Sequence, residues 1–310
     1  MRANHERQNG SALITSLLVI GLCSTIIAGM VWQQNLQARQ IEIQRDKVQV
    51  NWLQRGAVDW ARLILTEDLK NNSHDHLGEV WALPISDSQL DDFLKKVELG
   101  VELKGTSLKG QLFDAQSKFN LSNLWDSRFQ SVQPSGILAF ERLLEINGLD
   151  KKYAQQLSQK VLERDLPPGK LKDIPTIISM SDQEWRTLKD DLILLPEATL
   201  INVNTASAKV IFASMSGLSQ SNAEAIVSER AKKPFVTISE FRTFLGNMGF
   251  SSANQNSVNQ VGVSSRFFIA QAEIKHGSRV FVRSSLIERG NKASSTNNTR
   301  IIWEIDPRDM

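Results

Sequence analysis

GSALITSLLVIGLCSTIIAGMVW, residues 10–32, is the stretch from which the rest of the fold is predicted. No charged residue occurs between Arg7 and Arg39. The uncharged run therefore reaches the roughly twenty residues that a helix needs to cross a bilayer at about 1.5 Å per residue. It is longer than the apolar region of about 7–15 residues in a cleaved secretory signal, and polar sequence that still favours a helix follows it. We expect a retained membrane-spanning helix.

A short polar leader, residues 1–9, runs into Gly10 directly before this apolar run. The arrangement resembles the leader of type IV prepilins and pseudopilins, in which a membrane-embedded peptidase cuts after the glycine and methylates the new N-terminus. The resemblance implies a cut between Gly10 and Ser11. Most pilins carry Glu at the fifth mature position, where this chain has Thr15. The alternative is a plain N-terminal anchor in which the glycine is accidental.

Composition places the remainder of the chain among ordinary globular proteins. The 310 residues allow about two domains, and a net charge of +2 gives no bulk attraction to nucleic acid. The single cysteine, Cys23, lies inside the apolar run, so no disulfide can form within the chain. Arg2 and Arg7 precede the span, which favours a cytoplasmic N-terminus. The bulk of the chain would then lie across the membrane.

The helix is expected to continue from Gln33 to about Leu69, because proline is absent and apolar residues recur near helical spacing. These residues are Ile41, Val48, Trp52, Leu53, Ala57, Val58, Ala61, Ile64 and Leu65. We expect this stripe, with Trp52 and Trp60, to cover one face of a sheet in the same chain.

Strand periodicity occurs at both ends of the remaining sequence. Before the middle region the expected strands are residues 97–104 and 109–114, separated by a Gly105-Thr106-Ser107 turn. After it they are residues 267–275, 279–287 and 300–305, with a hairpin turn at Gly277 and a loop at residues 289–298. The prediction is an α+β fold in which a long helix packs on a small antiparallel sheet and a large all-α domain is inserted between strands.

From Gly136 to about Gly262 the period is helical and contains a weak repeat. Hairpins at Gly148 and Gly217 each precede an apolar helix, and Asn204 or Thr205 is expected to cap the helix before the second hairpin. The pattern resembles the helix-hairpin-helix module of competence-type DNA receptors. Such a module presents a Gly-x-Gly hairpin to phosphate, whereas here Asp150 and Ser219 stand at the second glycine positions. A packing scaffold is favoured, and membrane-anchored DNA binding is the alternative.

Several segments, in this order, resemble protein K of type II secretion systems. They are the leader without the pilin glutamate, Trp-Ala-x-Pro at residues 81–84, Phe-Asn-Leu-x-x-Leu at 119–124, Asn-Val-Asn-Thr-Ala at 202–206, and the helical insert. The resemblance implies a minor pseudopilin that caps the pseudopilus tip and supports protein export. Its partners would be other minor pseudopilins and the prepilin peptidase, with no nucleic acid. It would be anchored in the inner membrane, with its bulk in the periplasm.

The resemblance also suggests how the chain is divided. The expected parts are a leader at 1–10, a transmembrane segment at 11–34, a first pilin-like part at 35–118, an inserted helical domain at 119–264 and a second pilin-like part at 265–310.

No catalytic constellation is recognisable, so an enzyme is not expected. The histidines are His5, His74, His76 and His276, and no nucleophile elbow, zinc-protease pair or phosphate loop occurs. His74-Asp75-His76 could in principle hold a metal, but a solvated turn is the more ordinary interpretation. Members of the resembling family can hold structural calcium. No compact loop of oxygen ligands is assignable from this sequence.

Overall fold

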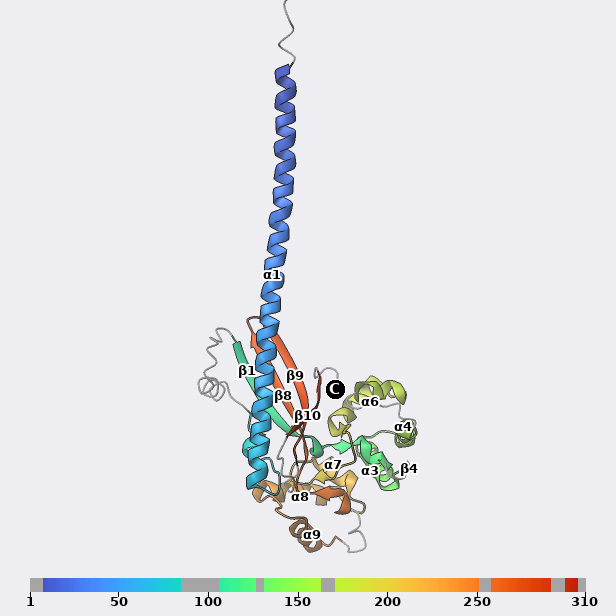
Figure 1. Ribbon diagram of the computed structural model, residues 1–310. Coiled ribbons are helices and arrows are strands. Elements are labelled where there is room, and N and C mark those ends of the chain that lie inside the picture. The colour runs from blue at the N-terminus through green and yellow to red at the C-terminus, as the bar shows by residue number, and fades with distance from the viewer. Residues whose placement is uncertain are drawn as a thin grey trace, which may run out of the picture. The chain divides into compact units, whose positions relative to one another are not determined.

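The computed structural model describes residues 8–84, 106–126, 131–162, 171–250, 258–290 and 299–305 (Figure 1). Helix α1 (Gln8–Asn71) begins the chain. Its first part, up to Leu53, forms one unit, and residues 54–310 form a second. In the first unit the side chains of the apolar run are exposed, for example Leu18 at 67% and Trp32 at 71%. A helix of this length and hydropathy can span a membrane.

The second unit contains a four-stranded antiparallel sheet in the order β1-β8-β9-β10. Its strands are β1 (Thr106–Asp114), β8 (Phe267–His276), β9 (Arg279–Glu288) and β10 (Arg300–Ile305). The C-terminal strands match the sequence prediction, and Gly277 makes the β8–β9 turn at a φ of 58°. The predicted Gly105-Thr106-Ser107 turn is wrong, because Thr106 and Ser107 pair with His276 and Lys275 in the sheet. The predicted strand at residues 97–104 lies outside the described residues.

The end of α1 covers one face of this sheet, as the apolar stripe predicted. Val58, Ala61 and Leu65 are buried with Trp81 against side chains of three strands. Those side chains are Leu112, Phe268, Ala270 and Ile287.

The stripe itself is narrower than expected, because Ile41, Val48 and Trp52 are 65%, 55% and 66% exposed. A helix turns by about 100° per residue, so Val48 and Trp52, which follow Ile41 by 7 and 11 positions, lie within about 20° of Ile41 around the helix. Ala61 lies nearly on the opposite side of the helix from Ile41. The expectation that Trp52 covers the sheet is therefore wrong. The helix carries a buried apolar face in its last turns and a separate exposed row of Ile41, Val48 and Trp52.

The chain between β1 and β8 forms the predicted helical insert. Its main helices are α3 (Pro134–Ile146), α4 (Lys152–Leu162), α5 (Ile174–Ile177), α6 (Asp182–Leu188), α7 (Ala208–Ser214), α8 (Gln220–Lys232) and α9 (Ile238–Asn247). Short 3-10 turns and two-residue strands join them. Strand β2 (Phe119–Asn120) pairs in parallel with β5 (Leu192–Ile193), β3 (Trp125–Asp126) pairs antiparallel with β4 (Ser131–Val132), and β6 (Ile201–Asn202) pairs in parallel with β7 (Val261–Gly262). One apolar core runs through the insert, with Phe140, Leu143 and Leu157 fully buried.

The weak repeat corresponds to two helical hairpins. Gly148 joins α3 to α4 and Gly217 joins α7 to α8, with φ values of 70° and 81°. Such angles are strained for residues with a Cβ, which explains glycine at both turns. Helices α3 and α7 pack against each other. The predicted cap of α7 is wrong: Ser207, not Asn204 or Thr205, accepts the hydrogen bond from Val210 N at 3.2 Å.

Candidate functional site

A buried polar network joins the helical insert to the sheet. Its centre is the Asp114 carboxylate at the end of β1, with a side chain only 3% exposed. Oδ2 of Asp114 accepts hydrogen bonds from Asn202 Nδ2 at 3.0 Å, Thr205 Oγ1 at 2.6 Å and Ser265 Oγ at 2.6 Å. Asn202 and Thr205 belong to the insert, and Ser265 stands just before β8. One carboxylate therefore fastens the insert to the sheet.

Local geometry presents each of these groups. Oδ1 of Asp114 accepts from Gln116 N at 2.8 Å, which makes Asp114 the cap of the next 3-10 turn. Oδ1 of Asn202 accepts from Asn204 N at 3.0 Å, and Asn204 bonds both backbone groups of Phe235. The Asn-Val-Asn-Thr-Ala motif is thus a set of turn and linking amides.

Burial also changes the charge behaviour of Asp114. Loss of water around the carboxylate raises its pKa from 3.8 to about 6, although the hydrogen bonds from Ser265, Thr205 and Gln116 oppose the rise. At neutral pH the Asp114 carboxyl is therefore ionised, although burial makes its charged form less favourable than it would be in water.

A second cluster adjoins the network and surrounds Arg289, which follows β9 and is 5% exposed. Its Nη1 lies 2.7 Å from Asp68 Oδ2 and its Nη2 lies 2.6 Å from Asp75 Oδ2. Asp75 Oδ2 also accepts from Ser265 N at 2.6 Å, and Asn202 Nδ2 donates to the Asp75 carbonyl at 3.1 Å. The end of α1, the segment after it, the insert and β9 therefore meet in one polar junction.

This junction tests whether the calcium implied by the family resemblance fits the described residues. Asp68, Asp75 and Glu79 bring carboxylate oxygens within 4.8 Å of one another. However, Arg289 already pairs with two of these carboxylates, and Glu79 accepts from Trp81 Nε1 at 2.6 Å and from His76 N at 3.0 Å. A divalent ion here would stand beside a fixed guanidinium. These residues do not fit calcium.

The two histidines of the candidate metal motif do not converge on a ligand position. His74 and His76 stack with ring centroids 5.3 Å apart, and His76 Nε2 lies 3.9 Å from Glu79 Oε1. Burial lowers the pKa of His76, with the neighbouring His74 acting in the same direction. The middle residue, Asp75, instead pairs with Arg289.

The predicted processing residues all fall within helix α1. Gly10 and Ser11 belong to its first turns. The exposed Thr15 donates its hydroxyl to the Ala12 carbonyl at 2.9 Å. Its side chain is thus bonded within its own helix, as hydroxyls in apolar helices commonly are.

The hairpins do not present open helix ends to phosphate. Asp150 accepts from Lys152 N at 2.9 Å, and Ser219 caps α8 by accepting from Asn222 N at 3.1 Å. At each hairpin, a side chain of the chain itself therefore bonds one of the backbone N–H groups that a helix start can offer to a phosphate.

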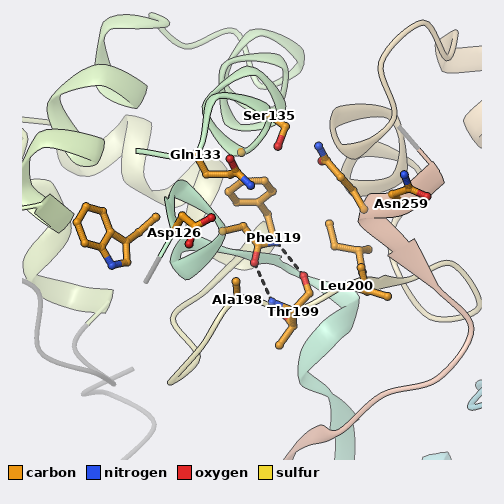
Figure 2. Close-up of a pocket in the computed structure, with 13 residues that line it drawn as sticks. Phe119, Asp126, Gln133, Ser135, Ala198, Thr199, Leu200 and Asn259 are labelled. Carbon is orange, nitrogen blue, oxygen red and sulfur yellow. Dashed lines mark hydrogen bonds between the residues drawn. The ribbon is translucent and has the colours of Figure 1, made fainter. Parts of the chain in front are cut away.

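A shallow cleft of about 300 Å³ lies within the insert (Figure 2). Phe119, Leu200 and the start of α3 line it, and Asn123 exchanges two 2.9 Å hydrogen bonds with the backbone of Thr199 at its edge. The first turn of α3 packs so closely that Gly136 leaves no room for a Cβ beside the Asn123 carbonyl. Its lining contains apolar, amide and hydroxyl groups and one carboxylate, Asp126.

Sequence reasoning missed Asp114, Ser265 and Arg289 as a group. One signal was available for Asp114: alternation along β1 puts it on the inward face with Leu108 and Leu112. A carboxylate at an inward position needs a buried partner. No comparable signal marked Arg289, which the sequence placed in a loop.

Comparisons with known proteins agree with this architecture. The model of the family "Type II secretion system (T2SS), protein K" matches residues 201–264, which hold β6, α7, α8, α9 and β7. Type II secretion system protein K of Pseudomonas aeruginosa is 28% identical over 316 residues, covering 91% of this chain and 89% of that protein. The chain is therefore similar to protein K of type II secretion systems along most of its length. It is thus a minor pseudopilin of the type II secretion system.

Two further relatives extend the agreement along the chain. Protein K of Pectobacterium carotovorum subsp. carotovorum is 22% identical over 323 residues, covering 91% of this chain and 93% of that protein. A crystal structure of the GspK-GspI-GspJ complex from enterotoxigenic Escherichia coli matches in fold, with a TM-score of 0.62 at 16% identity over 86% of this chain and 99% of the solved one. In this protein K homologue the Asn-Val-Asn-Thr-Ala segment carries the residues that bind Asp114.

Proposed function

We propose that this minor pseudopilin caps the tip of the pseudopilus in a complex with smaller minor pseudopilins, and so supports protein export. The observation that carries the proposal is the insert itself, residues 115–266, which stands between neighbouring strands of one four-stranded sheet. The network at Asp114 fixes this bulk to the sheet. A domain of this size would collide with neighbouring subunits if it were repeated along the pseudopilus filament, but a single copy can be accommodated at the filament tip.

The exposed row of Ile41, Val48 and Trp52 supports partner contact through the helix. Large apolar side chains exposed in a row on one side of a helix are typical of a helix–helix interface. The solved complex with the same fold contains protein K together with GspI and GspJ. By that likeness, the partners of this row are the helices of smaller minor pseudopilins.

Processing is the second element of the proposal. The prepilin peptidase cuts between Gly10 and Ser11, and the remaining span anchors the chain in the inner membrane with its bulk in the periplasm. The absence of a glutamate at Thr15 suits a tip position, because a tip subunit has no subunit above it whose amino group would pair with a carboxylate.

The proposed role is structural and not catalytic, with the parts divided as the sequence suggested: 1–10, 11–34, 35–118, 119–264 and 265–310. The acidic groups of the junction support it, since Asp114 Oδ2 accepts from three structural donors and Asp75 Oδ2 pairs with Arg289 and accepts from Ser265 N. Binding of DNA is not part of the proposal.

Site-specific crosslinking tests the tip position. In a Cys23→Ser background, a photoreactive maleimide that attaches to one thiol and inserts into neighbouring C–H bonds is coupled to Trp52→Cys, with Lys47→Cys as the control on another side of α1. We expect adducts with smaller minor pseudopilins from position 52 and far fewer from position 47. Adducts between copies of this chain, repeating along the filament, would refute the tip assignment.

The processing site is tested separately by the intact mass of the protein from cells with an active prepilin peptidase. The expected N-terminus is a methylated Ser11, and Gly10→Val should leave Met1 in place. Retention of Met1 in the unchanged chain would overturn this part.

A further inference from the structure

The cluster around Arg289 has the oxygen ligands of a divalent-cation site but encloses a guanidinium. Asp68 at the end of α1 and Asp75 and Glu79 in the following segment supply carboxylates within 4.8 Å of one another. Asp75 is 1% exposed and Glu79 is 6% exposed. Carboxylates buried this deeply require a positive partner.

Arg289 is held as that partner from several sides. Besides its ion pairs with Asp68 and Asp75, its Nη2 donates to the Ser265 carbonyl at 2.7 Å, and its guanidinium lies 4.8 Å from the centre of the Phe268 ring. Its own backbone N donates to the Arg266 carbonyl at 2.7 Å. The cation therefore has a fixed position and is coordinated mainly by oxygen, as a bound metal ion would be.

The cluster retains acceptor capacity that Arg289 does not use. Oδ1 of Asp75 is buried and makes no hydrogen bond within the described part of the chain. Without the guanidinium, the Oδ2 atoms of Asp68 and Asp75 and the Ser265 carbonyl would each lose a donor around one space, and Asp75 would have its unbonded Oδ1 besides. Calcium takes about six to eight oxygen ligands, so these atoms would provide about half to two thirds of a calcium shell, with waters supplying the rest.

We propose that Arg289 is a built-in cation occupying a latent divalent-cation site, so that the junction of α1, insert and sheet is stable without calcium. The inference is independent of the tip assignment. It predicts that removing the guanidinium creates calcium binding at Asp68 and Asp75.

The test compares the thermal unfolding of three full-length, detergent-solubilised proteins with and without calcium. Arg289→Ser removes the cation and leaves space for an ion and water. Arg62→Ser is the matched control, because Arg62 is another arginine with tertiary hydrogen bonds, to Thr299 at 2.8 and 3.0 Å, and its ion pair is with Asp59 rather than with the cluster. Unchanged protein and Arg62→Ser should show no calcium response from this cluster.

For Arg289→Ser we expect a lower Tm in chelator and a rise of about 5 °C when calcium reaches about a hundredfold excess over its Kd. The rise should disappear in Arg289→Ser combined with Asp75→Asn. Failure of Arg289→Ser to respond to calcium would overturn the proposal. A calcium response in the unchanged protein that Asp75→Asn abolishes would overturn it as well.

Two further measurements address two possibilities: that Arg289→Ser does not fold without calcium, and that an ion binds at this cluster even when Arg289 is present. If Arg289→Ser does not fold in chelator, it should refold when calcium is supplied, and failure in both conditions would count against the proposal. Terbium luminescence excited through Trp81, whose indole bonds Glu79 at 2.6 Å, reports an ion at this position. We expect this signal only in Arg289→Ser, and Trp81→Phe should abolish it. A Trp81-dependent signal in the unchanged protein would refute the inference.

Discussion

The ionisation of Asp114 should couple the stability of the insert–sheet junction to pH. The perturbation is Asp114→Asn, studied between pH 7 and pH 5. In the folded chain, burial raises the pKa of this carboxyl from 3.8 to about 6. A carboxyl whose pKa is higher in the folded state binds more protons when folded, so stability rises as the pH falls through about 6 and the gain is complete below 3.8.

The magnitude follows from the size of the shift. One pKa unit corresponds to about 1.4 kcal/mol. Between pH 6 and pH 5 the Asp114 carboxyl is mainly protonated in the folded chain but still ionised in the unfolded chain, so the stability rises by about this amount over that pH unit. The unchanged protein should therefore gain about 1.4 kcal/mol from this group between pH 7 and pH 5, or about 3–5 °C in Tm for a unit of this size. Asp114→Asn cannot take up this proton and should lack the gain.

Thermal unfolding of the detergent-solubilised chain, followed by tryptophan fluorescence, measures the effect. Asp68 has a pKa raised to about 6 chiefly by burial and acts in the same direction, while the lowered pKa of His76 acts in the opposite one. The informative quantity is therefore the difference in pH response between the unchanged chain and Asp114→Asn, in which these groups cancel. Equal responses in the two proteins would refute the reasoning, because Asp114 would then titrate alike in both states.

Three further outcomes are expected in unfolding and co-purification measurements. Gly136→Ala should destabilise the chain by about 1–3 kcal/mol, since its Cβ would lie 2.7 Å from the Asn123 carbonyl carbon, whereas Gly56→Ala, with open space around it, should stabilise by about 0.5–1 kcal/mol. Equal signs would contradict this. Phe140→Ala, in the core of the insert, should lose about 3–5 kcal/mol, and a loss under about 1 kcal/mol would place it outside that core. Trp52→Glu should leave the Tm nearly unchanged yet prevent co-purification of smaller minor pseudopilins, and intact co-purification would argue against the exposed row as interface.

Features encoded by near neighbours could be predicted from the sequence. The uncharged run, the C-terminal strands and the two helical hairpins depend on charge, alternation and glycine within a few residues. The family resemblance rested on the same kind of local motif. The errors arose where several local solutions compete: Ser207 and Asn204 can both cap a helix, and Thr106 suits a turn or a strand.

The division of α1 into a buried face and an exposed row needed the three-dimensional structure. The sequence shows apolar residues at helical spacing, but it does not say which of them meets the sheet. Val58 and Leu65 are buried against it, whereas Ile41 and Trp52 are exposed. Only the position at which the sheet crosses the helix decides between them, because each residue is equally able to be buried.

By itself, then, the sequence determined an N-terminal apolar helix, a sheet interrupted by a helical region and the turns that join them, because these follow from periodicity and local backbone preference. The tertiary structure alone decided the junction. Asp114 bonds Asn202 from 88 residues away, and Arg289 bonds Asp75 from 214 residues away. A buried charge is paired with whichever distant segment the fold brings beside it in the interior, and a local sequence pattern does not show which segment that is.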